Sequence, residues 1–450
     1  MSHPASPVPD NRERFPELHP ALDAKAALAE ANRCLFCFDA PCTAACPTHI
    51  DVPRFIKKIS SGNLRGSALT ILDANMLGLS CSRVCPVAVL CEGACVMHGY
   101  NQKPIEIGRL QRHAMDHFYA HGAVLPACPA PSAKTVACVG GGPASLACAA
   151  ELRRRGYPVT IFDNRPLPGG LNTYGIAEYK LRPADSLREV EMVRSLGVEF
   201  RRAEVGGPEA GKVSLDELER EFDLIFLGAG LGAMERLGIP GEQLPGVIGA
   251  LHFIERYKTF PGFPVGRCVV VIGGGNTAID AANAARRLGA EEVHLFYRRT
   301  EKEMPAFPFE YHHSKVEGVR FHWLAQPLEI VARDGHAAAV KFAETRLEEP
   351  DASGRRRATL VSGSDFEVAC DMVIPALGQS RFIAVLHESR GIELESGSIA
   401  VDRPTGRTTN PRYYAGGDCV NGGREVVDAV ADGKRAALAM ARQLEGATNG

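Results

Sequence analysis

KTVACVGGGPASLACAAELRRRGYPVTIFD, residues 134–163, runs from a short β-branched segment through three glycines and an apolar helical pattern to a second β-rich segment. This is the order of a dinucleotide-binding unit: strand, glycine turn, helix, strand and acid. Gly140 permits the tight turn, and Gly142 lets the backbone approach a pyrophosphate at the helix N-terminus. Asp163 lies 21 residues beyond Gly142, where it can bind a ribose 2′-hydroxyl. Ser145 stands where Gly or Ala is usual. The alternative is a doubly wound domain whose turn binds nothing.

A second unit of this kind spans residues 267–299, RCVVVIGGGNTAIDAANAARRLGAEEVHLFYRR. Its second strand ends at Tyr297 instead of an acid, and Arg298 and Arg299 follow. Without the acid nothing repels a 2′-phosphate, and guanidinium groups are suited to bind one. The pattern therefore favours NADPH over NADH, although solvated surface arginines are the alternative.

A third segment, residues 407–444, reads as a strand, a Gly-Asp turn and a long apolar helix. Such a turn places a carboxylate and another helix N-terminus near a cofactor. Alone it is a common motif, so its weight comes from the two complete nucleotide units before it.

Cysteines are concentrated near the N-terminus. Of 14 in the chain, eight lie in residues 34–95, in two groups of four. The first group follows the pattern C-x₂-C-x₄-C-x₃-C-P, close to the bacterial ferredoxin run whose last cysteine ligates the other cluster. Disulfides suit small secreted chains, and zinc prefers paired C-x-x-C motifs, of which only one occurs here. Two iron–sulfur clusters are therefore favoured, with zinc as the alternative.

Length and composition are those of a soluble protein of several domains. The chain has 450 residues, 45% of them hydrophobic, and a net charge of −2. A net charge this small does not indicate binding to nucleic acid or to a membrane surface. The sequence shows no pattern typical of a secretory signal peptide or of a membrane-spanning helix. We expect a cytoplasmic protein. The nucleotide units contain no C-x-x-C motif, which argues against a dithiol reductase.

The motifs GGGPASLACAAEL, PGGLNTYGIAEYKL, GGGNTAID with YRR, and YYAGGD resemble the FAD- and NAD(P)-dependent oxidoreductases with two dinucleotide-binding domains. CLFCFDAPCTAACPTHIDVPRFI, LGLSCSRVCPVAVLCEGAC and PIEIGRLQR are similar to the N-terminal part of dihydropyrimidine dehydrogenase and its bacterial PreT-type subunit. The glutamate synthase small subunit is a related type. The resemblance extends from about residue 25 to residue 442.

The resemblance implies an α/β fold in which a helical two-cluster domain precedes two Rossmann-like domains, the FAD domain being interrupted by the NAD(P) domain. The expected domains are 1–130 (iron–sulfur), 131–250 (FAD, first part), 251–370 (NAD(P)) and 371–450 (FAD, second part).

The resemblance also implies the binding residues. FAD is expected at Gly140, Gly142, Pro143, Ala144, Ser145, Asp163, Gly170, Leu171, Gly417 and Asp418. The nicotinamide nucleotide is expected at Gly273, Gly275, Asn276, Thr277, Ala278, Arg298 and Arg299. One [4Fe–4S] cluster would take Cys34, Cys37, Cys42 and Cys95, and the other Cys46, Cys85, Cys91 and Gln111. In that set Cys81 binds no cluster. If all the ligands were cysteines, Cys81 would take the place of Gln111.

The implied function is electron input: hydride passes from NAD(P)H to FAD, and single electrons leave through the two clusters. No side chain is nominated as a catalytic acid or base, because the cofactors supply the chemistry. No segment is left for an FMN barrel, so we expect a PreA-like FMN and iron–sulfur partner that reduces uracil or thymine. A glutamate synthase partner is the alternative, and an iron–sulfur redox sensor without enzyme activity is an alternative of another class.

Overall fold

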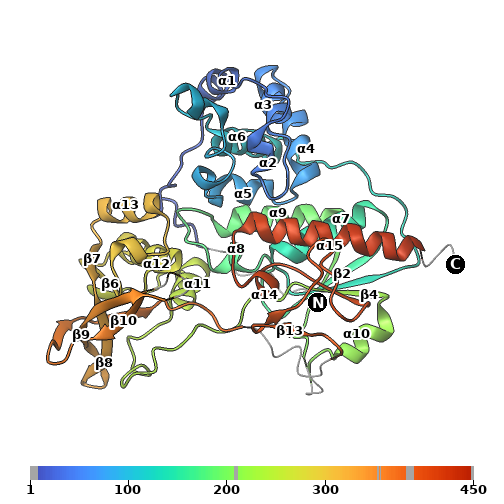
Figure 1. The fold of residues 1–450 in the computed structure, drawn as a ribbon. Coiled ribbons are helices and arrows are strands. Elements are labelled where there is room, and N and C mark those ends of the chain that lie inside the picture. The colour runs from blue at the N-terminus through green and yellow to red at the C-terminus, as the bar shows by residue number, and fades with distance from the viewer. Residues whose placement is uncertain (1–8, 207–210, 352–353, 355, 382–389, 447–450) are drawn as a thin grey trace.

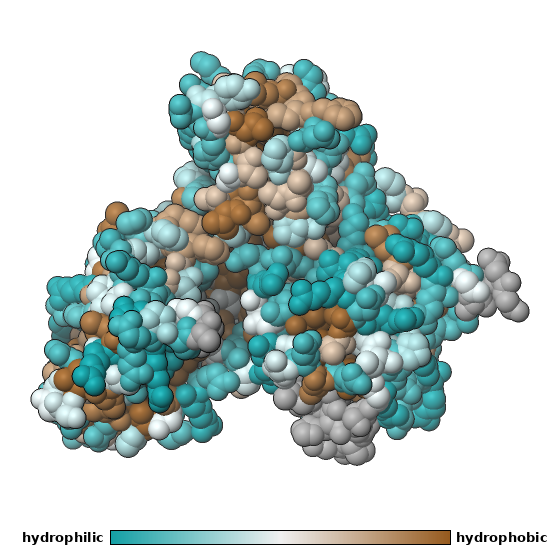
Figure 2. All heavy atoms as spheres, viewed as in Figure 1, coloured by the Kyte–Doolittle hydropathy of each residue, from teal (hydrophilic) through white to brown (hydrophobic). Residues whose placement is uncertain are grey.

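The computed structural model places a small helical domain above two α/β units that lie side by side (Figure 1). It describes residues 9–206, 211–351, 354, 356–381 and 390–446. The outer ends of the expected domain ranges, residues 1–8 and 447–450, lie outside the described residues. Figure 2 shows the surface hollowed between the two α/β units, below the helical domain.

Short capped helices build the N-terminal domain. The side chains of Asp23, Asp51 and Asn63 each accept a backbone N–H in the first turn of a helix, which satisfies a donor that the helix cannot. The buried faces of these helices share one apolar core with the helices of the first α/β unit. The elements are α1 (Ala24–Asn32), α2 (Pro41–Ala44), α3 (Val52–Ser60), α4 (Leu64–Ala74), α5 (Gly78–Val84), η1 (Val87–Val89), η2 (Val96–Tyr100) and α6 (Ile107–Ala120).

The first α/β unit is a parallel sheet in the order β15-β4-β1-β2-β3. Its strands are β1 (Val136–Val139), β2 (Val159–Asp163), β3 (Glu199–Arg202), β4 (Leu224–Leu227) and β15 (Tyr413–Ala415). Its helices are α7 (Pro143–Arg154), α8 (Leu171–Tyr174), α9 (Pro183–Ser195), α10 (Leu215–Glu221), α14 (Asp418–Asn421) and α15 (Val426–Gly446). Because β15 comes from the C-terminal part of the chain, this unit is interrupted by the second one, as predicted.

The second α/β unit is a parallel sheet in the order β12-β5-β6-β7. Its strands are β5 (Cys268–Ile272), β6 (Glu292–Tyr297), β7 (Arg320–Trp323) and β12 (Met372–Pro375). Its helical elements are α11 (Ala250–Thr259), α12 (Asn276–Leu288), η3 (Glu301–Glu303) and α13 (Pro308–Val316). The expected division of the chain assigns residues 372–375 to the returning FAD part, but β12 pairs with β5 in the second sheet.

Antiparallel strands cover one face of the second sheet, which the sequence patterns did not predict. Val270, Phe296 and Phe342 share one apolar cluster across the two layers, and the rings of Phe296 and Phe342 stack at 4.1 Å. These strands are β8 (Ala325–Arg333), β9 (His336–Pro350), β10 (Arg356–Leu360) and β11 (Phe366–Ala369); a separate pair is β13 (Leu394–Glu395) with β14 (Ser398–Ile399).

A buried carboxylate joins the helical domain to the first α/β unit. Glu189 on α9 accepts the backbone N–H groups of Leu79 at 2.8 Å and Ser80 at 3.0 Å, and also the Ser80 hydroxyl. The carboxylate therefore acts as the N-terminal partner of α5. No helix in the described ranges has the length and apolar character to span a membrane.

Candidate nucleotide and iron–sulfur sites

The first glycine turn connects β1 to α7, and its first two glycines, Gly140 and Gly141, are closely surrounded by other atoms. Gly140 has φ +90°, and a Cβ there would lie 2.6 Å from the Gly228 carbonyl oxygen. The N-cap residue of α7, Gly142, has no side chain that could cap the first N–H groups of this helix. Uncapped N–H groups at the start of a long helix fit a pyrophosphate.

Asp163 lies directly over this turn. Its Oδ2 accepts the Gly141 N–H at 2.7 Å and its Oδ1 accepts the Arg165 N–H at 2.8 Å. A Cβ on Gly141 would lie 2.2 Å from Oδ2, so a side chain at this position would displace the Asp163 carboxylate. Burial raises the pKa of Asp163, while the two backbone N–H groups oppose that effect. A carboxylate has about four acceptor sites, so these bonds leave capacity for ribose hydroxyls.

Two other segments meet the start of α7. Gly170 has φ +57°, and a Cβ there would lie 2.8 Å from Gly142 Cα. Gly417, from the C-terminal part of the chain, faces Ala144. A Cβ on Gly417 would lie 3.1 Å from the Cβ of Ala144. The structure therefore brings the three predicted FAD-binding segments together around one helix N-terminus, in a cradle of bare backbone that fits a dinucleotide.

The remaining predicted FAD residues lie around this cradle. Pro143 opens α7, and Leu171 opens α8 with 38% of its surface exposed. Asp418 accepts the Arg424 N–H at 3.2 Å, and burial raises its pKa. Ser145 is fully buried, and its Oγ has no hydrogen-bond partner among the described residues.

The second glycine turn connects β5 to α12. A Cβ on Gly273 would lie 2.3 Å from the Ala376 carbonyl oxygen, whereas a Cβ on Gly275 would meet no heavy atom within 4 Å. Gly275 is the N-cap of α12 and provides no side-chain cap, which again leaves a helix N-terminus suited to phosphate. In the first turn of α12, Asn276 accepts the Phe307 N–H at 3.0 Å, and Thr277 and Ala278 follow it.

The two arginines after β6, Arg298 and Arg299, lie in the loop that follows this strand. Arg298 is exposed and Arg299 is half-buried. Neither guanidinium forms an ion pair with an acid in the described part of the chain, and Arg299 Nε is buried without a hydrogen-bond partner there. Tyr297 packs on the turn, where a Cβ on Gly274 would lie 2.7 Å from its ring. These features fit a bound phosphate group.

The first predicted set of thiols converges on one cavity. This cavity is lined by Cys34, Cys37, Cys42 and Cys95, together with apolar side chains that include Val52, Ile56, Ile105 and Ile107. Burial raises the pKa of Cys42 to about 11, and the nearby Cys34 and Cys95 contribute. Three thiols from residues 34–42 and a fourth from Cys95, gathered around an apolar cavity, fit a [4Fe–4S] cluster.

The second group brings Cys46, Cys85 and Cys91 together, and Cys81 lies among them. A hydrogen bond with Cys81 and burial both raise the pKa of Cys85, and the nearby Cys91 and Cys46 add to the effect. Gln111 on α6 is buried and donates its side-chain amide to the Gly78 carbonyl oxygen at 2.8 Å. A ligating Gln111 would therefore use its amide oxygen. The choice between Gln111 and Cys81 stays a prediction.

Sequence reasoning missed a buried ion cluster between the two α/β units. Lys180, in the segment after α8, contacts Asp280 of α12 and Glu310 of α13, both at 2.7 Å. Tyr179 donates its hydroxyl to Asp280 at 2.7 Å. Burial raises the pKa of Glu310 to about 7. Asp280 and Glu310 lie 100 and 130 residues beyond Lys180 in the sequence, so no local sequence pattern predicts the cluster.

Two family models match the chain. Residues 11–123 match the model described as dihydropyrimidine dehydrogenase domain II, 4Fe–4S cluster, and residues 134–433 match the pyridine nucleotide-disulphide oxidoreductase model.

Among curated proteins, the glutamate synthase [NADPH] small chain of Escherichia coli is 36% identical, with 98% of this chain and 96% of the relative covered. The NADP⁺-dependent formate dehydrogenase subunit beta of Moorella thermoacetica is 38% identical, and the NADPH-Fe(3+) oxidoreductase subunit beta of Geobacter sulfurreducens is 36% identical. The matches cover 91% and 93% of this chain, respectively, but only 60% and 65% of these two relatives.

Among solved structures, the thioredoxin reductase of Lactococcus lactis superposes with a TM-score of 0.56 at 23% identity, covering 69% of this chain and 99% of that one. The FprA protein of Mycobacterium tuberculosis in complex with NADPH gives 0.56 at 22% identity, covering 70% and 86%. Both similarities concern the fold of the two α/β units.

Proposed function

The chain belongs to the pyridine nucleotide-disulphide oxidoreductase family, in the branch with an N-terminal 4Fe–4S domain that includes the glutamate synthase small chains, and from this premise we propose that it is an NADPH-oxidising electron-input subunit. One observation carries the proposal. A single chain holds two helix N-termini without side-chain caps and two converging groups of cysteines. When bound, FAD accepts hydride from a reduced nicotinamide and releases single electrons, which iron–sulfur clusters can carry.

The protein's contribution is binding and orientation. Asp163 and the backbone of residues 140–142 would hold the adenosine and pyrophosphate of FAD, and Gly417 closes the same cradle from the other side. Arg298 and Arg299 would hold the 2′-phosphate of NADPH, because guanidinium groups bind phosphate with several hydrogen bonds.

The first thiol group lies near the molecular surface. Cys34, Cys37 and Cys42 are half-buried, and Phe38 beside them is fully exposed. A cluster held there would be accessible to a partner protein, which supports electron exit through the helical domain. The relatives named as subunits beta and small chains are parts of larger enzymes, and we propose that this chain also works with a catalytic subunit.

Two acceptor subunits are supported by separate observations. The domain II match and the motif APCTAACPTHIDVPRFI support a PreA-like partner that reduces uracil or thymine. The match to glutamate synthase small chains over nearly their whole length supports a partner that forms glutamate from 2-oxoglutarate and glutamine.

The first experiment tests electron input itself. We expect purified, reconstituted protein to contain FAD and iron and to oxidise NADPH with an artificial electron acceptor. Bound FAD without any turnover would contradict the proposal and favour a redox sensor. The acceptor is then identified by isolating the native complex and comparing uracil with 2-oxoglutarate plus glutamine as substrates.

The second experiment tests the cluster ligands. We propose that Gln111 completes the second cluster, so Gln111→Ala should alter the electron paramagnetic resonance signal of one cluster. Cys81→Ser is the matched variant, since Cys81 contacts Cys85 without being a ligand in this assignment. An unchanged signal in Gln111→Ala together with a lost cluster in Cys81→Ser would support four cysteines instead.

A further inference from the structure

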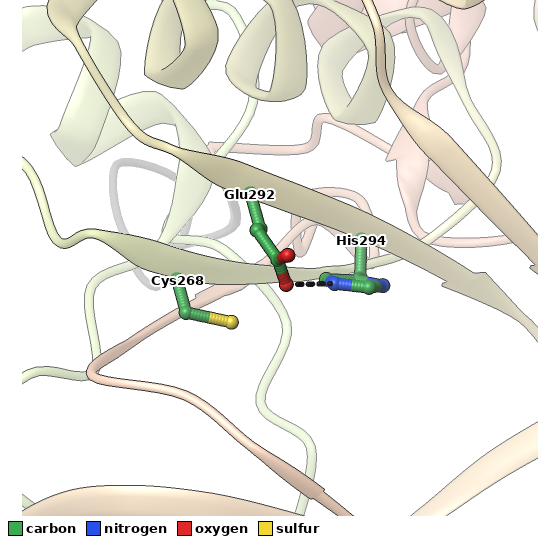
Figure 3. Close-up of side chains that lie close together, drawn as sticks. All are labelled: Cys268, Glu292 and His294. Carbon is green, nitrogen blue, oxygen red and sulfur yellow. Dashed lines mark hydrogen bonds and ion pairs between the residues drawn. The ribbon is translucent and has the colours of Figure 1, made fainter.

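Three side chains of metal-binding types, Cys268, Glu292 and His294, meet in the second sheet, near the beginnings of β5 and β6 (Figure 3). The sulfur of Cys268, a carboxylate oxygen of Glu292 and a ring nitrogen of His294 all lie within 4.8 Å of one another. Cys268 and His294 are half-buried, and Glu292 is exposed. Neither nucleotide binding nor electron transfer, as described above, uses these residues.

Strand register explains why they meet. Cys268 pairs directly with Glu292 across the parallel strands β5 and β6, and Val270 pairs with His294. Side chains two residues apart on a strand share one face of the sheet, so all three point to the same side. That face is covered by the antiparallel layer, and the Cys268 thiol donates to the Ala369 carbonyl oxygen of β11 at 3.2 Å. Strand register therefore places the three side chains on one face of the sheet.

A second histidine supports His294 from behind. His294 Nδ1 lies 2.9 Å from His322 Nε2, and His322 stacks on Phe296 with ring centroids 4.3 Å apart. The other nitrogen of His294, Nε2, lies 3.3 Å from Glu292 Oε2. When Nδ1–H donates to His322, the lone pair of Nε2 points toward the carboxylate. Histidines that bind metals are usually held in this way by a hydrogen bond at their other nitrogen.

We propose that Cys268, Glu292 and His294 form a site for Zn²⁺. Thiolate, imidazole and carboxylate together are typical zinc ligands, and the thiolate disfavours Mg²⁺ and Ca²⁺. Three protein ligands leave one tetrahedral position for water. Arg320 pairs with Glu292 Oε1 at 3.3 Å, which leaves Oε2, the oxygen nearer His294, for the metal.

The site is separate from the nicotinamide site. Cys268 begins β5, whereas the glycine turn at Gly273 follows the other end of the same strand, roughly 16 Å away at about 3.3 Å per residue. The metal therefore joins the beginnings of β5 and β6, and it does not contact the nucleotide. Substitution of Cys268 should leave NADPH oxidation unchanged.

The test uses the whole protein with its clusters loaded. After a chelator wash and exposure to ZnCl₂, the repurified wild type should retain about one zinc per chain by elemental analysis. Cys268→Ser and His294→Ala should lose that zinc, while Cys128→Ser, which changes a cysteine between α6 and β1, should keep it.

X-ray absorption at the zinc edge separates this site from zinc bound to cluster cysteines. We expect one sulfur at about 2.3 Å and nitrogen or oxygen ligands at about 2.0 Å. A zinc ion surrounded by four sulfurs, zinc retained in both Cys268→Ser and His294→Ala, or no retained zinc in the wild type would each overturn the proposal.

Discussion

The two glycine turns have the same sequence pattern, three glycines between a strand and a helix, but a different side chain packs on each turn. In the first turn the Asp163 carboxylate accepts the N–H of the middle glycine, Gly141. In the second turn the ring of Tyr297 packs against the middle glycine, Gly274. The first arrangement offers carboxylate oxygens that can accept ribose hydroxyls. The second offers the ring of Tyr297, which Arg298 and Arg299 follow in the chain. We propose that the side chain at the end of the second strand decides whether each turn binds ribose hydroxyls or a 2′-phosphate.

The units also differ in how they are held. The first unit is joined to the helical domain through Glu189, which bonds to the start of α5. The second unit is held to the first through Lys180, which bridges Asp280 and Glu310.

The largest expected effect is at the first turn. Gly140→Ala should reduce bound FAD to roughly a tenth of the wild-type content or less, because a side chain at φ +90° would press on the Gly228 carbonyl oxygen. The flavin-to-protein absorbance ratio measures this. Gly275→Ala is the control, since its Cβ meets no atom within 4 Å and the variant should keep its FAD. Full FAD content in Gly140→Ala would show that this turn does not hold the flavin.

The next largest effect concerns Arg298 and Arg299, the residues that we propose to bind the 2′-phosphate of NADPH. Replacing both Arg298 and Arg299 with Ala should raise the KM for NADPH about 10- to 100-fold, or about 1.4–2.7 kcal/mol, by removing two charged contacts. The KM for NADH should change little. Arg267→Ala is the control, because this exposed arginine pairs with Glu291. Equal loss with both nucleotides, or NADH preferred by the wild type, would contradict this role.

A smaller effect should follow from giving the second turn the acid of the first. Tyr297→Asp should lower the ratio of kcat/KM for NADPH to that for NADH about tenfold, because the carboxylate repels a 2′-phosphate and accepts ribose hydroxyls. Tyr297→Phe keeps the ring and loses only the hydroxyl bond to the Glu303 carbonyl oxygen. Tyr297→Phe should retain the wild-type ratio. If Tyr297→Asp also retains it, the residue at position 297 does not determine the preference for NADPH.

The contrast between the turns was only half visible in the sequence. The glycine spacing and the acid at Asp163 are local signals. They predict the two turns and the ribose contact of Asp163 in the first one. The contact of Tyr297 with Gly274 depends on the path of β6. Cys268 and Glu292 are 24 residues apart and meet only through strand register, which is why Cys268 reads as an isolated cysteine in the sequence. Long-range partners of this kind follow from tertiary packing.

The smallest expected effect concerns Glu189, which attaches the first unit to the start of α5. Burial raises the pKa of Glu189 to about 7, whereas its hydrogen bonds to Leu79 and Ser80 lower it. The folded protein then binds more protons at this site than the unfolded chain, whose glutamate titrates near 4.5. Stability must therefore fall as the pH rises from about 4.5 to about 7, by up to about 1 kcal/mol between pH 6 and pH 7.

Glu189→Gln should remove this pH dependence, because an amide oxygen can still accept the two backbone N–H groups and does not titrate. Thermal unfolding of the loaded protein at pH 6 and pH 8 measures the difference, which should be roughly 1–3 °C in the wild type. Glu191→Gln, on the exposed side of the same helix, is the matched control and should behave as the wild type. If Glu189→Gln keeps the wild-type slope, the carboxyl group is ionised throughout this range, and the junction between the helical domain and the first unit carries a buried charge.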